Sequence, residues 1–482
     1  MRQKRCFVKL HNTLTGTVDE LQPLESGKVK LYTCGVTVYS QPHVGNWLGY
    51  IYWDVLVRAL KAGGYEVERT QNITDVGHLV SDDDSGEDKM EKGARAEGVT
   101  AWDVAKKYSG IAEHEAYDLL GLLRPDHLIA ATSCIDKQIE FAKTLDEKGD
   151  LYRTDDGMYF DTSKLSDYGK LARLDIAGLE AGARVDMAGK KNPTDFAVWK
   201  FSPKNAQRDM EWESPWGVGF PGWHLECSVI ARETLGDQID IHTGGIDHIP
   251  VHHTNEIAQT ESVTGKSFST FWVHNNFLKI DGTKISKSLG NIYTLQDIVG
   301  KGFSLDAFKL VALSKHYRTE GNFTWEILEA AQNRLNHWRE VAALRWQLDD
   351  SFEQTQPGSE KMALGLAKSL RTQLIEALSS DLDTPKALAA IDAALDAIQS
   401  QPIERLHPAA IAAVFASIDE LLGLRIITST PDVHSEIKTM LRERAATRTE
   451  KNWAKSDELR DLLATKNIGV RDTASGSFWY YI

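Results

Sequence analysis

Four residues of metal-binding type are scattered along the chain. The stretch "VHHTNEIA" places His252 and Glu256 four residues apart, so the two side chains would share one face if this segment is helical. Upstream, "PGWHLECS" contributes Cys227 and "LYTCG" contributes Cys34, neither within a CxxC pair. Thiolate, imidazole and carboxylate are all zinc ligands. Because no compact ligand spacing is present, the residue types alone leave both a metal site and unrelated buried side chains open.

Two glycine-containing stretches have the chemistry to bind phosphate. In "PHVGN" a strand-like segment gives way to a helix, whose free N–H groups and partial positive charge suit an anion. There His43 could donate a hydrogen bond, and Gly45 would let a ligand approach the backbone closely. In "DGTKISKSLGN", Lys284, Ser286 and Lys287 lie on a glycine-bounded loop that suits a polyphosphate whose charge grows during reaction. Taken singly, a structural histidine and a solvated surface loop are the plainer interpretations.

The elements that must position these residues predict an α/β fold. "KVKLYTCGVTVYS" is β-branched and indicates a strand ending near Cys34. Apolar residues then follow helical spacing up to Gly63 and Gly64, and "EVERTQNIT" indicates the next strand. Strand, helix and strand at this length predict a βαβ unit. Downstream, "GDQIDIHTGGIDHI" indicates a strand and a glycine-rich turn, as in a second α/β half.

The remaining segments predict further domains. A chain of 482 residues is too long for one core. Residues 135–221 are irregular and rich in turn residues, which indicates an inserted subdomain, whereas 325–424 is Ala/Leu-rich with helical periodicity. The acidic stretch 81–98 has little to bury, so we expect an exposed loop or linker there. A basic helix, "IKTMLRERAATR", opens the last fifty or so residues.

Composition restricts the class of protein. The formal net charge of −14 bears on solubility and non-specific binding; it neither favours nor excludes a nucleic acid, because a local basic face can serve. No stretch approaches the roughly 20 apolar residues needed to span a bilayer, and the start of the chain does not resemble a signal peptide. Four cysteines are too sparse for a disulfide scaffold. We therefore expect a cytoplasmic protein without a membrane partner.

The two candidate phosphate-binding stretches are more informative together than singly. "HVGN" after a strand near the N-terminus, with "KISKS" at the end of a second α/β half, resembles the HIGH and KMSKS signatures of class I aminoacyl-tRNA synthetases. Asn46 stands at the last position of the first motif and can donate a hydrogen bond but carries no charge. Ile285 replaces the methionine of the second motif, an apolar exchange of little consequence.

Within that class, one family is closely similar. The stretches that carry the resemblance are "YTCGVTVYSQPHVGN", "NITDVG", "PGWHLECS", "HHTNEIAQTES", "KISKSLGN" and "LSKHYRTEGNFTWE", and more weakly "SDLDTPKALAA" and "WAKSDELRDLLATKNIGVRDT". They resemble the cysteinyl-tRNA synthetase family from about Lys28 through the helical region and into the tail. The resemblance implies a ligase that activates cysteine with ATP to cysteinyl-adenylate and then transfers cysteine to the 3′ end of tRNA-Cys.

The resemblance also implies a zinc site. By it, Cys34, Cys227, His252 and Glu256 converge on one Zn²⁺, and the family motif favours His252 over the adjacent His253. Zinc binds a thiolate strongly, so the thiolate of the substrate could be a direct ligand, whereas the hydroxyl of serine is a far worse one. Pocket size alone discriminates poorly between near-isosteres. Zinc would therefore select cysteine without an editing domain, and no stretch indicates one.

The remaining site residues follow from the same resemblance. The ATP phosphates, with Mg²⁺, are expected to bind at the two signature motifs, and Asp247 could bind the ribose or the amine of the substrate. The expected catalytic residues are His43, Asn46, Lys284 and Lys287; those expected at ATP are His43, Gly45, Asn46, Asp247, Lys284, Ser286 and Lys287; those expected around cysteine are Gly35, Thr37, Thr74 and Trp223.

The implied architecture is a Rossmann-type class I synthetase catalytic domain with an inserted connective subdomain, a helical bundle and a small C-terminal anticodon-binding module. The expected boundaries are 1–134 and 222–304 for the two catalytic halves, 135–221 for the insertion, 305–430 for the helical domain and 431–482 for the module. A monomer is the family default.

Two alternatives stay open. A tRNA-independent cysteine ligase of the mycothiol-pathway type would use the same zinc site and adenylate chemistry but join cysteine to an amino-sugar. The long helical extension and its basic helix favour tRNA instead. A non-catalytic RNA-binding protein on a synthetase scaffold is the more distant alternative, and the retention of both phosphate motifs argues against it.

Overall fold

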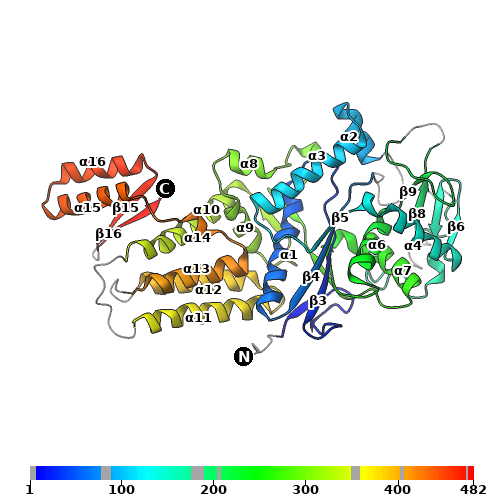
Figure 1. Ribbon diagram of the computed structural model, residues 1–482, viewed down its shortest axis with the longest axis horizontal. Helices are drawn as coiled ribbons and strands as arrows, with labels where there is room; N and C mark the ends of the chain where they lie inside the picture. Colours follow the sequence, from blue (N-terminus) through cyan, green and yellow to red (C-terminus); the bar gives the residue numbers. More distant parts are fainter. Residues whose placement is uncertain are drawn as a thin grey trace.

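The computed structural model describes residues 7–77, 88–174, 189–203, 208–348, 359–401, 406–473 and 476–482. At its centre lies a five-stranded sheet in the order β11-β10-β3-β4-β5, in which every neighbouring pair is parallel (Figure 1). The strands are β3 (Lys28–Thr33), β4 (Glu66–Ile73), β5 (His127–Ala130), β10 (Ile239–Gly245) and β11 (Ser269–Asn275). The strand order reverses between β3 and β10, so a ligand site is expected beyond their carboxyl ends.

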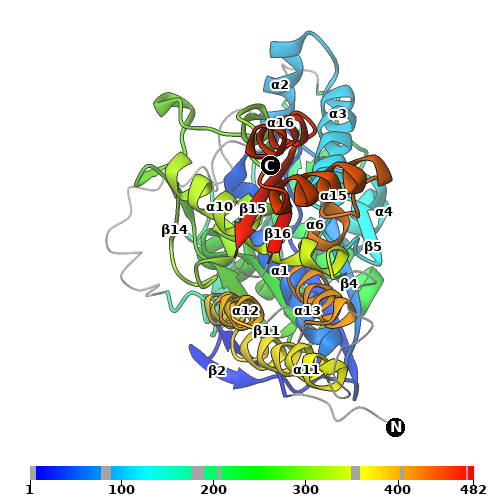
Figure 2. The same ribbon diagram turned by 90° about the vertical axis from the view of Figure 1, so that its left-hand side faces the viewer.

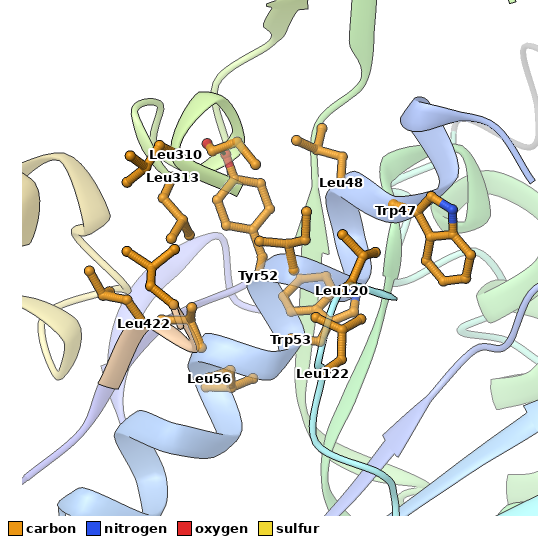
Figure 3. Close-up of a cluster of buried hydrophobic side chains, with 14 of the residues drawn as sticks. Trp47, Leu48, Tyr52, Trp53, Leu56, Leu120, Leu122, Leu310, Leu313 and Leu422 are labelled. Carbon is orange, nitrogen blue, oxygen red and sulfur yellow. Dashed lines mark hydrogen bonds between the residues drawn. The ribbon is translucent and has the colours of Figure 1, made fainter. Parts of the chain in front are cut away.

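The predicted βαβ unit is confirmed, with helix α1 (Val44–Ala62) between β3 and β4. Gly63 caps the helix, and Gly64 adopts a φ of 89°, which favours glycine. The apolar residues of α1 surround the helix because both the sheet and later helices pack against it. Figure 3 shows this cluster, with Trp47, Leu48, Tyr52, Trp53 and Leu56 of α1 against Leu120, Leu122, Leu310, Leu313 and Leu422.

Two helices follow the first βαβ unit and correct one prediction. The acidic stretch 81–98 was expected to be a loop, but its second part forms helix α2 (Lys89–Glu97), which is followed by α3 (Ala101–Glu113) and a π-helical turn (His114–Leu119). The Asp88 carboxylate caps α2, while Met90 and Ala94 are buried. Two apolar positions one turn apart suffice to dock this helix, although the surrounding charges obscure them in the sequence. Residues 81–87 lie outside the described part of the chain.

The predicted insertion contains a regular antiparallel sheet. Its order is β6-β7-β8-β9, and helix α4 (Ile135–Glu147) precedes it; both lie at the right of Figure 1. The strands are β6 (Leu151–Arg153), β7 (Gly157–Phe160), β8 (Phe196–Phe201) and β9 (Gly219–Pro221). They are only three to six residues long, which is too short for alternation to show in the sequence. Helix α6 (Trp223–Leu235) returns the chain to the central sheet.

Helices dominate the second half of the chain, as predicted. They are α7 (Thr254–Thr264), α8 (Leu295–Gly300), α9 (Leu305–Leu313), α10 (Trp325–Ala343), α11 (Ser359–Leu378), α12 (Thr384–Gln399), α13 (Pro408–Leu422) and the short α14 (Ile426–Ser429). Two further small sheets are described: the N-terminal hairpin of β1 (Lys9–Asn12) and β2 (Thr17–Glu20), and, in the second half of the chain, a sheet of β12 (Leu278–Ile280), β13 (Thr283–Lys284) and β14 (Gly321–Phe323).

The C-terminal residues form a separate small module. Helices α15 (Ser435–Thr449) and α16 (Trp453–Ala464) pack on the hairpin of β15 (Ile468–Thr473) and β16 (Gly476–Tyr481). The module projects at the left of Figure 1 and faces the viewer in Figure 2. Trp479 and Gln347 exchange hydrogen bonds of 2.8 and 2.9 Å, which join the module to the turn that follows α10. In the described part of the chain, no helix is both long and apolar enough to cross a membrane.

Candidate active site

The four predicted metal ligands converge at the point where the strand order reverses. Cys34 follows β3, Cys227 lies on α6, His252 lies in the π-helical turn that leads into α7, and Glu256 lies in the first turn of α7. One ligand atom from each lies within 4.8 Å of all the others, and all four side chains are buried. The two Sγ atoms are 3.9 Å apart, too far for a disulfide bond. His252 Nε2 lies 2.9 Å from Glu256 Oε1.

A second donor set overlaps the first one. Cys34 and Glu256 also lie within 4.8 Å of His242 and His253, neither of which was predicted as a ligand. His253 Nε2 lies 3.3 Å from Cys34 Sγ, while its Nδ1 lies 2.7 Å from His274. His242 Nε2 lies 2.9 Å from Glu256 Oε2. The quartet with His252 brings two sulfurs together, whereas the other set contains one, so the soft donors favour the predicted quartet.

The four side chains of the cluster strongly affect one another's protonation. Burial opposes ionisation, but the neighbouring His242 and His252 lower the pKa of Glu256 to about 2. Burial would also lower the pKa of His252, yet the Glu256 carboxylate and Cys227 raise it to about 10. Burial raises the pKa of the Cys34 thiol. Burial acts in the same direction at Cys227, but its contacts with Cys34 and His252 hold the pKa of Cys227 below its usual value. The donor types fit a divalent zinc ion, and binding it would require His252 and the Cys34 thiol to give up their protons.

Trp223 closes one side of this cluster. Its ring stacks on His252, with centroids 4.2 Å apart, and meets His248 edge-on. His252 also contacts His224, with 3.1 Å between the two Nδ1 atoms. An aromatic wall next to a ligand histidine fits the predicted place of Trp223 around a small substrate.

The predicted substrate residues Gly35, Thr37 and Thr74 lie at the ends of β3 and β4. A backbone bridge joins Thr37 to Thr74, and the Asn72 amide donates to the Thr74 hydroxyl at 2.9 Å. Asn72 also accepts a hydrogen bond of 2.6 Å from the Gly35 N–H. A Cβ added to Gly35 would lie 1.6 Å from the Asn72 carbonyl oxygen, so this approach requires glycine. The structure thus brings Gly35, Thr37 and Thr74 close to one another.

His43 and Asn46 form the N-cap of α1. The Asn46 N–H donates to His43 Nδ1 at 3.3 Å, and the Asn46 side-chain oxygen accepts from the His43 N–H at 3.0 Å. Because Nδ1 accepts, the neutral imidazole carries its proton on Nε2, which can donate to a phosphate oxygen. Burial lowers the pKa of His43, which favours this neutral form. The oxygen of Asn46 is occupied by the cap, and only its NH₂ group can serve a ligand.

The two signature motifs lie against each other. A Cβ added to Gly45 would lie 2.5 Å from Cδ1 of Ile285, and the Val44 N–H donates to the Tyr293 carbonyl at 2.8 Å. The two motifs therefore meet in space, although they are far apart in the sequence. Lys284 is exposed on β13, and the hydroxyls of Ser286 and Ser288 lie 2.8 Å apart. The side chain of Lys287 lies outside what the structure describes.

Asp247 follows β10 in a short 3₁₀ turn, Ile246–His248. Its side chain is exposed, and a Cβ added to Gly245 would lie 2.2 Å from its Oδ1. Its charge contributes to the raised pKa of Cys34 after the larger effects of burial, Cys227 and Glu256. A carboxylate near the metal cluster and open to solvent fits its predicted role toward an amine or a ribose.

Sequence reasoning missed several residues that organise the site. Asn72 holds Gly35, Asn291 holds the "KISKS" loop, and His242 holds Glu256. Asn72 and Asn291 lie inside the quoted stretches "NITDVG" and "KISKSLGN", which is the one signal that could have drawn attention to them. Nothing in the sequence marks His242, because its partner is reached through the packing of α7 on the sheet.

Comparisons with known proteins point to the same family along most of the chain. The family model described as "tRNA synthetases class I (C) catalytic domain" matches residues 20–333, and the one described as "Cysteinyl-tRNA ligase anticodon binding domain" matches residues 430–479. The chain is 44% identical over 471 residues to "Cysteine--tRNA ligase 1" of Burkholderia lata, covering 97% of this chain and 95% of the relative. It is 38% identical over 499 residues to "Cysteine--tRNA ligase" of Treponema denticola, covering 98% and 99%.

Solved structures show the same fold at low sequence identity. Methionyl-tRNA synthetase of Mycobacterium tuberculosis, in complex with methionyl-adenylate, superposes with a TM-score of 0.62 at 16% identity, covering 82% of this chain and 92% of that chain. A LeuRS–tRNA–LeuAMS ternary complex of Agrobacterium radiobacter K84 gives a TM-score of 0.60 at 11% identity, covering 86% and 88%.

Proposed function

We propose that this chain, which belongs to the cysteine–tRNA ligase family of class I aminoacyl-tRNA synthetases, activates cysteine with ATP and joins it to tRNA-Cys. The predicted family and fold class are both confirmed. Within the site, one observation supports cysteine as the amino acid substrate. Two sulfurs, an imidazole and a carboxylate lie in one buried cluster, which is formed by Cys34, Cys227, His252 and Glu256.

The metal proposed for this cluster is Zn²⁺. One zinc ion bound there would supply a Lewis acid that accepts a thiolate far better than a hydroxyl, which favours cysteine over serine. The four side chains would hold it, and His224 and His242 would orient His252 and Glu256. Trp223, Gly35, Thr37 and Thr74 would enclose the rest of the amino acid, and Asp247 would face its amine or the ribose.

The proposed chemistry of activation is in-line attack of the cysteine carboxylate on the α-phosphate of ATP, with pyrophosphate leaving. His43 would donate from Nε2 to a phosphate oxygen, and the close backbone at Gly45 would admit the nucleotide. Lys284, Ser286, Lys287 and the NH₂ group of Asn46 would stabilise the charge that develops on the phosphates, together with Mg²⁺. No nucleophile from the protein is required.

The second proposed step is attack of the 3′-terminal adenosine hydroxyl of tRNA-Cys on the carbonyl of the adenylate, which forms the aminoacyl ester, breaks the bond between that carbonyl and the phosphate oxygen, and releases AMP and a proton. The match of the C-terminal segment to an anticodon-binding domain supports tRNA as the acceptor. None of the relatives reported above supports the tRNA-independent ligase of the mycothiol type. The five domain boundaries stated from the sequence, the monomeric state and the cytoplasmic location stay predictions.

ATP–pyrophosphate exchange with each amino acid, with zinc measured on the same sample, tests this function. We expect about one zinc per chain and a preference for cysteine over serine well above the roughly 10–200-fold that packing alone supplies. Cys227→Ser is expected to lose zinc and cysteine activation. Cys134→Ser, which changes a thiol outside the cluster, is the matched control and should behave as wild type. A Cys227→Ser variant that keeps its zinc and activates cysteine normally would show that the site is wrong.

A further inference from the structure

Glu115 is a buried acidic residue in the π-helical turn that continues α3, and its exposure is 0%. Its backbone carbonyl accepts from the Leu120 N–H at 2.9 Å, which is one of the hydrogen bonds that define the turn. Single turns of this kind are rare and occur frequently at functional sites. Burying a carboxyl group is costly unless hydrogen bonds replace the lost water, so the partners of Glu115 indicate why it is there.

The three side-chain donors to Glu115 flank the two signature motifs. Its Oε2 accepts from Trp47 Nε1 at 2.9 Å, and its Oε1 accepts from Nε2 of Gln41 at 3.2 Å and of Gln296 at 3.0 Å. Gln41 precedes His43 by two residues, and Trp47 lies near the start of α1. Gln296 lies on α8, which follows the second motif. Gln41 also donates to Oε1 of Gln296 at 2.6 Å, which closes a ring of three side chains.

This network joins the two motifs through a third element. Directly, the motifs are linked by the hydrogen bond from the Val44 N–H to the Tyr293 carbonyl. Glu115 adds an acceptor that the segments around both motifs share, and it belongs to neither of them. A buried polar network whose members are paired rigidifies the elements that it joins. The hydrogen bonds of Glu115 therefore fix how the start of α1 lies relative to α8.

We propose that Glu115 is a positioning residue for the ATP site, which holds His43 and the "KISKS" loop in their relative places before the nucleotide binds. The inference rests on the proposed function, in which the two motifs bind the phosphates of ATP. Glu115 acts through Gln41, Trp47 and Gln296 and does not itself touch the nucleotide. Groups that are already held in place need less ordering on binding, and they start the reaction in the right geometry.

Glu115→Gln in the full-length chain keeps the size of the side chain and replaces one acceptor by an NH₂ group. Either Trp47 or the two glutamines would then face a donor instead of an acceptor. We expect the dissociation constant of ATP, measured by calorimetry without cysteine, to rise about tenfold, the cost of ordering one or two more side chains. The kcat of ATP–pyrophosphate exchange is expected to fall by up to about 10²-fold.

The KM for cysteine and the zinc content should stay as in wild type, because the network does not reach the metal cluster. A merely structural role for Glu115 would lower the melting temperature and leave ATP binding unchanged. A Glu115→Gln variant with the wild-type dissociation constant for ATP therefore overturns the inference.

Asp195→Asn is the matched control. Asp195 is also buried, at 2% exposure, and accepts hydrogen bonds from Tyr152, Thr162 and Asn192 within the insertion. The substitution makes the same change in a part of the chain that contributes to neither motif. We expect a lower melting temperature and an unchanged dissociation constant for ATP. If it weakens ATP binding as much as Glu115→Gln does, loss of any buried acceptor has this effect and the inference is wrong.

Gln296→Ala gives a second test, which does not depend on how well Glu115→Gln folds. Gln296 is exposed, so its replacement should leave the fold intact. We expect a rise of several-fold in the dissociation constant of ATP. In the Glu115→Gln background the same substitution should add less than it does alone, because residues of one hydrogen-bond network are coupled. Normal ATP binding in Gln296→Ala, or effects that simply add, would contradict the role of Glu115.

Failure of this inference can be told apart from failure of the proposed function. If wild type activates cysteine and both variants bind ATP normally, only the role of Glu115 is wrong. If wild type binds ATP without activating cysteine, and both variants bind ATP more weakly, the assigned amino acid is wrong and the positioning role stands. A wild-type chain that binds no ATP overturns both.

Discussion

The side chain of Asn291 makes three hydrogen bonds that hold the loop of the second signature motif. Its oxygen accepts from the Ser286 N–H at 2.8 Å, and its NH₂ group donates to the Lys284 carbonyl at 3.0 Å and the Thr283 hydroxyl at 3.1 Å. An exposed lysine loses rotamer entropy when it engages a phosphate. A backbone that is already held in place reduces the further ordering that binding requires.

We therefore expect Asn291→Ala to slow ATP–pyrophosphate exchange by up to about 10²-fold, the cost of a misplaced catalytic group. Zinc content should not change, because the loop contributes no ligand to the metal cluster. Asn336→Ala removes an amide of α10 that accepts from Gln332, and it serves as the control. Normal exchange in Asn291→Ala would mean that the loop is ordered without this side chain.

At the scale of an element, the cationic side chains of α15 differ: some are buried in ion pairs and others are exposed to solvent. Of the basic residues in this segment, which are Lys438, Arg442, Arg444, Arg448 and Lys451, several would share one face of a helix and could offer charge to an RNA backbone, but Arg444 does not belong to such a surface. Arg444 is buried at 1% exposure and pairs with Asp472 through both Nη atoms at 2.8 and 2.9 Å. It holds α15 to β15 because a buried guanidinium requires a carboxylate partner.

The other cationic side chains of α15 and of the turn that follows it differ in ion pairing and in exposure to solvent. Arg448 also approaches Asp472, at 3.1 Å, and lies over the ring of Trp453; Lys438 pairs with Asp432 at 2.7 Å. Arg442 and Lys451 are exposed. If the module binds RNA, these two have the most accessible charge.

Arg442→Ala combined with Lys451→Ala is expected to raise the KM for tRNA-Cys and to make its salt dependence shallower, by about one unit of slope for each phosphate interaction that the substitutions remove. Cysteine-dependent pyrophosphate exchange should stay unchanged. Arg444→Met should instead destabilise the module, on the order of 3 kcal/mol because Asp472 is itself 28% exposed. A double variant with the wild-type salt dependence would contradict the RNA interpretation of α15.

At the scale of the whole molecule, α1 joins the catalytic sheet to the helical bundle. Arg58 pairs with Asp54 at 2.7 Å and donates to the Glu420 carbonyl on α13, while Lys309 of α9 donates to the Gly423 carbonyl. Beside them, Asp419 accepts from the N–H groups of Ile426 and Ile427, both at 2.9 Å. Charged groups therefore lie within an interface that is otherwise apolar.

This interface makes stability depend on pH. Burial raises the pKa of Asp419 to about 6, although the two backbone N–H groups oppose this. The folded state then binds the proton more tightly than the unfolded state, whose aspartate pKa is about 3.9. The contribution to stability is full below about pH 4 and is lost as pH rises through 6, and it amounts to at most about 3 kcal/mol before solvent screening.

Melting temperatures of wild type and Asp419→Asn, compared between about pH 4 and pH 7.5, check this dependence. The wild type is expected to lose stability relative to the variant as pH rises, because asparagine does not ionise. Taking the difference between the two proteins cancels the other titrating groups. A difference that stays constant across this range would contradict the assignment to Asp419.

The sequence by itself determined the features that depend on neighbouring residues. The strand before Cys34, helix α1 up to Gly63 and the return strand β4 follow from local periodicity and glycine, and all three are present as predicted. The two signature motifs and the quoted family stretches were sufficient for the family and the fold class, because residue identity at fixed spacing is a property of the chain alone. The short strands of the insertion and helix α2 in the acidic stretch were not predicted, because segments with so few apolar residues show no recognisable hydrophobic periodicity.

Only the tertiary structure decided which of these residues are free to act. The chain shows two adjacent histidines before Glu256, and packing brings His252 to the two sulfurs while His253 meets Cys34 and His274. Likewise Arg444 and Arg442 are alike in sequence, yet one is buried against Asp472 and the other is exposed. The physical reason is that burial and the partners of a polar group depend on segments remote in the chain, and local pattern carries no information about which segments will meet.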